Sequence, residues 1–327
     1  MNARKAAAVI GILSALMLAA GIILYFVWEA GERQKIVAEY LPDSSQITEA
    51  DIYVGGKRYI YNQDLVNILF MGVDKSEEVR IQNISGKAGQ ADNIMLISLN
   101  TEEQTARVIQ ISRDSMTDID IYDAAGNYYM TINAQLALQY AYGLGGKSSC
   151  WAVKKTVREL LYDVPIDAYV SLNVGGIGAI NDALGGVTVV MEDDYTDIDP
   201  HFTEGEKVHL DGVMAERYIR KRDINVDASN QDRMKRQSDY LSALSAVMGE
   251  KHRQGTLDYE SIYQVAEPYM VTDISLELLK TLGEYRYLTD EIEYLPGEIR
   301  AGEQYEEYHI DDMQLQNDIV RWFYLPV

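Results

Sequence analysis

Charged residues flank three apolar runs of strand length in the first half of the chain: 66–73, 93–100 and 107–112. Asp74 follows the first run, Asp92 precedes the second, and Arg113 and Asp114 follow the third. Two carboxylates and an arginine brought together suit a hard cation beside a phosphate. Mg²⁺ takes one or two carboxylates together with substrate oxygens, and guanidinium binds phosphate through two hydrogen bonds. The alternative is that these residues simply end strands in water.

A second cluster is cationic, and it contains seven basic residues: Arg217, Arg220, Lys221, Arg222, Arg233, Lys235 and Arg236. In extended chain Arg220 and Arg222 point the same way, and in a helix Arg233 and Gln237 share a face. That face continues to Tyr240, Leu241 and Leu244, so it would match an amphiphile with a phosphate head and an apolar tail. The chain as a whole has a net charge of −22, so this local basic excess predicts an anionic ligand. The alternative is a basic surface joined to an ordinary core face.

A β-hairpin would bring the first cluster together. The polar stretch 101–106 joins the second and third runs, which predicts an antiparallel pair with Asp92 beside Arg113 at one edge. If the first run also pairs antiparallel with the second, Asp74 joins them there. Further strands and helices are expected from periodicity and capping residues: a helix at 134–142 capped by Asn133, a helix at 150–162, a strand at 169–174, a helix at 177–184, a strand at 187–191, a long helix at 229–251 and a run at 276–282. This order predicts an α/β fold with a mixed sheet.

The N-terminus predicts a membrane anchor. Residues 6–28 contain no charged side chain and would span about 34 Å as a helix, enough for the hydrocarbon core of a bilayer. Arg4 and Lys5 precede the segment, which places the N-terminus in the cytoplasm and the rest of the chain outside. A cleaved signal peptide is the alternative. The expected organisation is a tail at 1–5, a transmembrane helix at 6–28, a stalk at 29–63 and one domain at 64–327.

Composition narrows the function further. The acidic field of the whole chain argues against nucleic acid as a partner, because phosphate repulsion would oppose every encounter. Cys150 is the single cysteine, so no intrachain disulfide can form, and its place before an amphipathic run predicts a core residue rather than a nucleophile.

Several of these stretches resemble the LytR-CpsA-Psr family of membrane-anchored cell-wall glycopolymer ligases. The matching blocks run in family order along the chain: 67–74, 89–95, 111–114, 132–134, 182–187, 218–222, 233–237 and 271–275. The resemblance implies a three-layer α-β-α sandwich with a mixed central sheet, which follows one N-terminal transmembrane helix. This domain would lie outside the cell of a bacterium, in most cases a Gram-positive one. It implies a Mg-dependent phosphotransferase that moves a glycopolymer phosphate, as in teichoic acid or capsule attachment, from a polyprenyl-pyrophosphate carrier to peptidoglycan.

The resemblance also implies roles for single residues. It carries Mg²⁺ binding onto Asp74 and Asp92, and catalysis onto Arg113 and Asp92. It carries pyrophosphate binding onto five residues: Arg113, Arg220, Arg222, Arg233 and Gln237. A carboxylate near the metal, Asp92 or Asp114, would accept the proton of the attacking hydroxyl.

The chain departs from the family pattern at four positions: Ser76 and Gln90 stand where arginines are usual, Ala91 where a serine is usual, and Ser112 where a proline is usual. Two lost cations should weaken pyrophosphate binding, and Arg80 or Lys87 in the long segment between Asp74 and Asp92 would be the replacements. The alternatives to the ligase are a non-catalytic relative that binds polyprenyl phosphate lipids or regulates envelope assembly, and a structural wall-associated module.

Overall fold

The computed structural model describes most of the chain after residue 51: residues 52–82, 84–221, 236, 239–240, 243–244, 246–248, 250–251, 254–275, 285–288, 293–302 and 305–327. No helix within these ranges is both long enough and apolar enough to cross a membrane. The expected anchor at 6–28 lies outside them. So do the expected run at 276–282 and three predicted site residues: Arg222, Arg233 and Gln237.

A seven-stranded mixed sheet forms the centre of the molecule, and its main path follows the order β11 (Met270–Thr272), β8 (Ala168–Asn173), β3 (Leu65–Val73), β4 (Ala91–Asn100), β5 (Thr105–Ile111), β12 (Arg286–Tyr287), with β13 (Glu293–Tyr294) also pairing with β5. β3 pairs antiparallel with β4, and β4 pairs antiparallel with β5, as the sequence predicted. β8 lies parallel to β3 on its other side. The central strands are apolar along most of their length because both faces of the sheet are covered.

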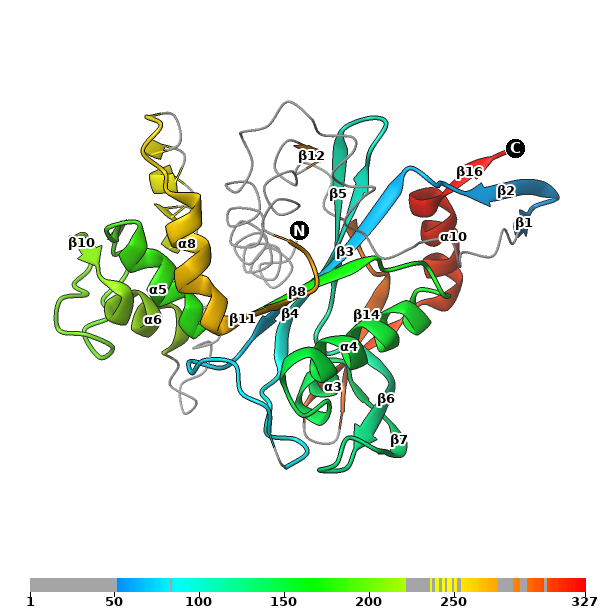
Figure 1. The fold of residues 1–327 in the computed structure, drawn as a ribbon, viewed down its shortest axis with the longest axis horizontal. Coiled ribbons are helices and arrows are strands. Elements are labelled where there is room, and N and C mark those ends of the chain that lie inside the picture. The colour runs from blue at the N-terminus through cyan, green and yellow to red at the C-terminus, as the bar shows by residue number, and fades with distance from the viewer. Residues whose placement is uncertain are drawn as a thin grey trace.

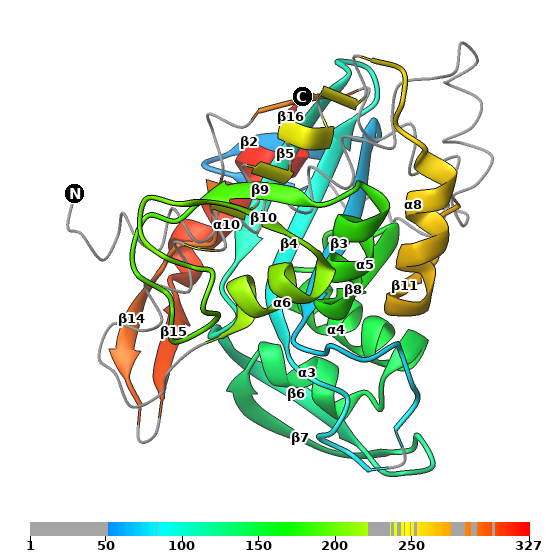
Figure 2. The same ribbon diagram turned by 90° about the vertical axis from the view of Figure 1, so that its left-hand side faces the viewer.

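Helices pack on both faces of this sheet (Figure 1). One face carries α3 (Ala137–Tyr142), α4 (Gly146–Leu160) and α10 (Asp312–Phe323), and the other carries α5 (Gly175–Ala183), α6 (Gly212–Arg220) and α8 (Tyr259–Ala266). Figure 2 turns the second layer toward the viewer, with the sheet behind it. Alternate side chains of β3 divide between the two cores: Leu69 and Met71 pack under α3 and α4, whereas Ile68 and Phe70 pack under α5 and α6.

Smaller strand pairs complete the fold: β6 (Met116–Tyr122) with β7 (Tyr128–Gln135), β9 (Val187–Val190) with β10 (Lys207–Leu210), β14 (Gly297–Ala301) with β15 (Glu306–Ile310), and β2 (Lys57–Tyr61) between β1 (Ile52–Val54) and β16 (Tyr324–Pro326). A 3₁₀ turn, η1, covers Glu267–Tyr269. The expectation that Asn133 caps a helix from 134 is wrong. Asn133 lies in β7, where its Nδ2 donates to Asp118 Oδ1 at 3.0 Å, and α3 begins at Ala137.

Other expected elements agree with the structure within a few residues. Cys150 lies in the first turns of α4 and is fully buried, as predicted for a core residue. Burial raises the pKa of its thiol to about 12, so it is protonated at neutral pH. The described positions between 236 and 251 are helical, and the start of that expected helix lies outside the described residues.

Candidate functional site

The sheet brings Asp92 and Arg113 to one edge. β4 begins there and β5 ends there, with Ile94 opposite Ile111 in the antiparallel pair. Arg113 Nη1 forms an ion pair with Asp92 Oδ1. Both side chains are about one third exposed, at 32% and 36%. A ligand in solvent can therefore reach the pair.

Gln90 links this pair to Asp74. Its backbone N donates to Asp74 Oδ1 at 2.7 Å, and its side-chain Oε1 accepts from Arg113 Nη2 at 2.7 Å. Asp74 N in turn donates to Gln90 O at 3.1 Å. Asp74, Gln90, Asp92 and Arg113 therefore form one hydrogen-bonded group, which we call the sheet-edge cluster.

Gly89 allows this connection. Its φ is +97°, a conformation that side chains with a Cβ rarely adopt. A Cβ at this position would also lie 2.9 Å from Asp74 Oδ1 and 2.8 Å from Lys75 Cγ. A larger residue at 89 would thus displace Asp74 from the backbone N–H of Gln90.

Asp114 supports Arg113 from the other side. Its Oδ1 lies 3.5 Å from Arg113 Nε and accepts a hydrogen bond from Gln135 Nε2 at 3.0 Å. Burial raises the pKa of the Asp114 carboxyl, and the charge of Arg113 partly offsets that increase. Arg113 Nε itself is buried and makes no hydrogen bond in the described part of the chain. At Nε the guanidinium therefore has only this longer ion-pair contact with Asp114.

Arg220 reaches the same region from α6. Asp211 caps that helix by accepting from Met214 N at 2.8 Å, and Arg220 is its last residue. Arg220 Nη1 donates to Glu216 Oε1 at 2.7 Å, one turn earlier, and contacts Ser76 Oγ. Ser76 also donates to Glu216. Ser76 lies two residues beyond Asp74, so this contact connects Arg220 to the loop that carries the sheet-edge cluster.

Arg236 holds the end of α6 in place. It is buried, and it donates from Nε to Tyr218 O at 2.7 Å and from Nη2 to Lys221 O. Its guanidinium carbon lies 4.9 Å from the ring centroid of Tyr195. Arg236 thus satisfies carbonyls at the helix end that would otherwise lack donors, and its contacts are structural.

The structure separates other predicted residues from this cluster. Arg217 pairs with Asp199 at 3.1 Å. Tyr240 and Leu244 lie in the core under α5 and α6, where Tyr240 OH donates to Asn181 Oδ1 at 3.0 Å. This part of the helix face that was expected to match an amphiphile therefore belongs to the protein core. Arg80 and Lys87 form no ion pair with Asp74 or Asp92 in the described residues, and they line a cavity next to the cluster.

Sequence reasoning missed three participants: Gln90, Ser76 and Glu216. Two of them occupy the positions at which the chain departs from the family pattern, so the departures themselves were the signal. Both contact an arginine of the predicted site: Gln90 contacts Arg113, and Ser76 contacts Arg220. The third could have been found from the four-residue spacing between Glu216 and Arg220 on one helix.

The sheet-edge cluster suits a cation that is held mainly by its substrate. The described residues contain no group of three or more His, Cys, Asp or Glu side chains placed to hold a metal by themselves. Asp74 and Asp92 are two carboxylates tied to the same Gln90–Arg113 pair. Mg²⁺ at phosphate sites usually has one or two carboxylates, with phosphate and water oxygens as its other ligands, so this donor set fits.

A mixed α/β sheet with an arginine–carboxylate cluster at one edge is an arrangement that can bind a phosphate together with a cation. Comparison with known sequences makes the assignment specific. The chain belongs to the LytR_cpsA_psr family, whose model matches residues 31–317.

Curated relatives are similar over two thirds of the chain. A polyisoprenyl-teichoic acid–peptidoglycan teichoic acid transferase, TagU, from Bacillus cereus is 29% identical over 232 residues, 69% of this chain and 66% of the relative. The protein of the same name from Halalkalibacterium halodurans is 28% identical over 238 residues, 68% of this chain and 71% of the relative. The match thus spans just under two thirds of the length of the Bacillus cereus protein.

Solved structures share the fold. Protein gbs0355 from Streptococcus agalactiae superposes with a TM-score of 0.56 and 21% identity, covering 79% of this chain and 87% of that protein. TagV from B. subtilis gives a TM-score of 0.52 and 22% identity, covering 80% of this chain and 97% of that protein. At these identities the likeness extends to the fold alone.

Proposed function

We propose that this chain is a phosphotransferase that moves a glycopolymer phosphate from a polyprenyl-pyrophosphate carrier to peptidoglycan. Family membership and the names of the relatives support the class of reaction. In this proposal residues 6–28 anchor the chain in the membrane, and the described domain lies outside the cell, where both the lipid carrier and the wall are accessible. Teichoic acid is the glycopolymer that the relatives' names favour.

The reaction forms one phosphorus–oxygen bond and breaks another. A hydroxyl oxygen of a wall sugar attacks the phosphorus nearer the glycopolymer. The bond to the bridging oxygen of the pyrophosphate breaks, and polyprenyl phosphate leaves with the bonding electron pair. The protein's main tasks are to position the pyrophosphate and to stabilise the charge that develops on the leaving group.

Arg113 is placed for that task in the proposal. One terminal nitrogen is held by Asp92 and the other by the neutral Gln90, Nε lies 3.5 Å from Asp114 Oδ1, and the side chain is 32% exposed. This fixes the plane of the guanidinium while leaving binding capacity for phosphate oxygens. Arg220 would add a second positive charge from α6, and Arg222, Arg233 and Gln237 would complete the pyrophosphate site.

Asp74 and Asp92 would hold a magnesium ion, which when bound would neutralise charge on the pyrophosphate oxygens. Asp74 is exposed directly after the end of β3, and of its two carboxylate oxygens only Oδ1 accepts a hydrogen bond in the described structure. The hydrogen bond from the Gln90 backbone N–H fixes the orientation of the Asp74 carboxylate, which can still act as a ligand of the magnesium ion.

The attacking hydroxyl must lose a proton, and two carboxylates next to Arg113 are candidates to accept it. Both lie against Arg113: Asp92 forms an ion pair with Nη1, and Asp114 Oδ1 lies 3.5 Å from Nε. Burial raises the pKa of Asp114, which makes it a stronger base than an ordinary aspartate. This raised pKa favours Asp114 as the proton acceptor in the proposal.

The observation that carries the proposal is the shared contact of Arg113 with Asp92 and Gln90, next to Asp74. The test is an assay for release of polyprenyl phosphate from a lipid-linked glycopolymer by the full chain in membranes. Asp74→Ala and Arg113→Ala should each strongly reduce release, whereas Arg158→Ala, on the outer face of α4, should leave it unchanged. Tight binding of the lipid by the unmodified chain without release would instead indicate the non-catalytic alternative.

A further inference from the structure

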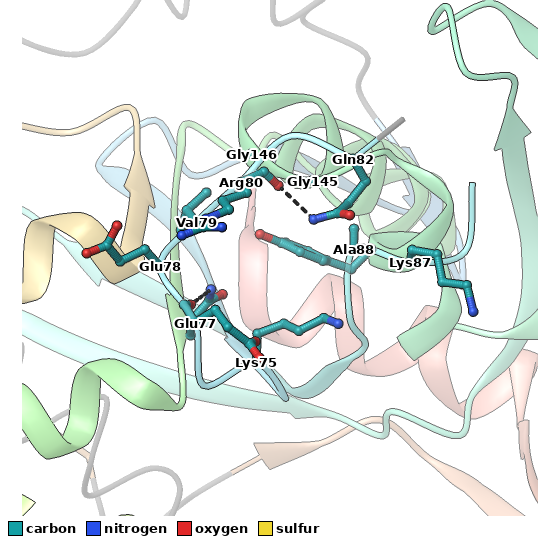
Figure 3. Close-up of a pocket in the computed structure, with 12 residues that line it drawn as sticks. Lys75, Glu77, Glu78, Val79, Arg80, Gln82, Lys87, Ala88, Gly145 and Gly146 are labelled. Atoms are coloured by element: carbon teal, nitrogen blue, oxygen red, sulfur yellow. Dashed lines mark hydrogen bonds between the residues drawn. The ribbon is translucent and has the colours of Figure 1, made fainter. Parts of the chain in front are cut away.

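A cavity of about 300 Å³ lies beside the sheet-edge cluster, between the loop at residues 75–90 and the start of α4. Lys75, Arg80 and Lys87 line it together with Gly145, Gly146 and Gln82 (Figure 3). The buried Tyr140 and Ala88 also form part of its wall. The cavity is therefore polar at its opening and apolar where it meets the core.

Backbone contacts hold the loop in position around this cavity. Gln82 N donates to Leu144 O at 2.8 Å, Gly86 N donates to Ala141 O at 3.1 Å, and Asn173 Nδ2 donates to Glu77 O at 2.8 Å. Gly175 N, at the start of α5, donates to Lys75 O at 3.0 Å. The loop is thus tied to both helical layers, and the cavity has a defined shape.

Gly145 is required for this close packing. Its φ is +86°, and a Cβ there would lie 2.6 Å from Arg80 O. Because the residue before α4 has no side chain, the backbone of the loop can lie against the start of the helix. This contact brings Arg80 to the cavity.

The cations of this cavity are not paired with carboxylates. Lys75, Arg80 and Lys87 make no ion pair anywhere in the described chain, although the protein carries 51 acidic residues against 29 lysines and arginines. Figure 3 shows the Lys75 amino group directed toward the cavity, Lys87 at its rim with the amino group turned outward, and the carboxylate of Glu78 turned away. Glu77 also lines the cavity, and it is exposed.

The start of α4 adds to this positive environment. Gly146, the first residue of that 15-residue helix, lines the cavity, and the helix has no side-chain cap. The backbone N–H of Gly146 has no acceptor in the described part of the chain. Lysine, arginine and a helix N-terminus together form a combination that binds phosphate groups.

We propose that this cavity is a second anion subsite, which binds a phosphate group of the glycopolymer while the pyrophosphate occupies the sheet-edge cluster. The inference rests on the function proposed above. Lys75 directly follows Asp74, and Ala88 lies two residues before Gln90, so one loop connects the two sites. A polymer with repeated phosphates could contact both, and the subsite would select a phosphate-containing polymer over a neutral one.

The test measures binding by calorimetry with the full chain and three probes: sn-glycerol 3-phosphate, inorganic phosphate and glycerol. The subsite is expected to bind glycerol phosphate, and glycerol not at all. The double variant Lys75→Gln/Arg80→Gln should weaken that binding about tenfold or more, because two charge-assisted contacts are lost. Lys207→Gln, an exposed lysine on β10, is the matched control and should bind as the unmodified chain does.

Independence from the pyrophosphate site is tested with the same proteins. Glycerol phosphate should still bind in saturating pyrophosphate and in Arg113→Gln, whereas pyrophosphate binding should fall in Arg113→Gln and persist in Lys75→Gln/Arg80→Gln. Displacement of glycerol phosphate by pyrophosphate would overturn the proposal, as would unchanged binding by the double variant or no binding by the unmodified chain. A muramyl peptide is used as a further probe. Its selective binding, in place of the phosphate probes, would also overturn the proposal and would indicate an acceptor site.

These outcomes separate the subsite from the proposed reaction, because none of the binding measurements needs turnover. The unmodified chain could bind glycerol phosphate in a way that depends on Lys75 and Arg80, yet release no polyprenyl phosphate. That result would reject the transferase and retain the subsite. Stronger binding of inorganic phosphate than of glycerol phosphate would show a site for free phosphate and would reject the polymer as occupant. Thermal unfolding of each variant verifies that it is folded.

Discussion

Two arginines of this protein make opposite uses of the same chemical group. Arg321, on α10, donates from Nη1 and Nη2 to both carboxylate oxygens of Glu293, at 2.7 and 3.0 Å, and from Nη2 to Asp318 at 3.0 Å. Its guanidinium carbon also lies 5.5 Å from the ring centroid of Trp322. Arg107 donates to the same Glu293 at 3.1 Å. This group of side chains is closed, because its cations meet carboxylates on the protein.

Arg113 forms an open arrangement by comparison. One of its terminal nitrogens donates to the carboxylate of Asp92, the other donates to the neutral amide of Gln90, and Nε has only a longer contact, 3.5 Å, with Asp114 Oδ1. Both terminal nitrogens of Arg321 therefore donate to carboxylates, whereas only one terminal nitrogen of Arg113 does. An arginine with a neutral acceptor at one terminal nitrogen keeps capacity there for an anionic ligand, whereas one whose terminal nitrogens both meet carboxylates contributes to stability.

Removal of Arg113 should have the largest functional effect. Arg113→Ala should reduce the rate of polyprenyl phosphate release by roughly 100- to 1,000-fold, the usual cost of losing one donor aimed at developing charge. The free energy of unfolding in urea should change little, because the ion pair with Asp92 is about one third exposed. Release at the unmodified rate from the Arg113→Ala protein would contradict the assignment of Arg113 to the site.

Closing the open arginine should have the next largest effect. Gln90→Glu keeps the shape of the side chain and gives the second terminal nitrogen of Arg113 a carboxylate, as both terminal nitrogens of Arg321 have. We expect pyrophosphate affinity, measured by calorimetry, to fall about tenfold, since a charged partner competes with the ligand for the guanidinium. Gln316→Glu, on the exposed face of α10, is the matched control. Equal or tighter pyrophosphate binding by Gln90→Glu would contradict the comparison.

Removal of Arg321 should affect stability and leave the reaction unchanged. Arg321→Ala should lower the free energy of unfolding by about 1 kcal/mol or less, because the side chain is 53% exposed and solvent screens its ion pairs. The measurement is urea unfolding followed by circular dichroism. Arg300→Ala, which breaks an isolated exposed pair with Glu298, should have a smaller effect. Lost polyprenyl phosphate release in a folded Arg321→Ala protein would show that the two clusters are not separate.

The smallest effect is a pH dependence at Glu293. Burial opposes ionisation of this carboxyl, but hydrogen bonds from Arg321 and the charge of Arg107 lower its pKa overall. Its contribution to stability is therefore present above the pKa of an unfolded glutamate and is lost as pH falls through the lower folded value. Glu293→Gln should be less stable than the unmodified chain at pH 7, and the difference should shrink below about pH 4. A difference that stays constant between pH 7 and pH 3 would contradict this.

The central sheet could be predicted because its strands are long apolar runs with clear polar breaks. β3, β4 and β5 each appeared as such a run, and a short polar connection identified the β4–β5 hairpin. The β6–β7 hairpin was missed, because its strands carry few buried residues. With little burial to impose a pattern, the polar segment around Asn133 looked like the start of a helix.

The candidate site was only partly predictable for a different reason. Asp92 and Arg113 lie on adjacent antiparallel strands, so sequence order alone places them together. Arg220 contacts Ser76 across 144 positions of sequence, and no periodicity encodes that contact. The sequence identified Gln90 only as a position where an arginine is absent. In the structure its backbone N–H contacts Asp74 and its side-chain oxygen contacts Arg113, so it joins the two residues.

The sequence by itself determined the central sheet, the meeting of Asp92 with Arg113 and the membership of the family. These depend on burial and on strand pairing between near neighbours, which leave a local signal. Only the tertiary structure decided how the 75–90 loop is placed, and with it the cavity that Lys75 and Arg80 line beside the sheet-edge cluster. That placement depends on close backbone approaches at Gly145 and Gly175, which belong to helices far along the chain.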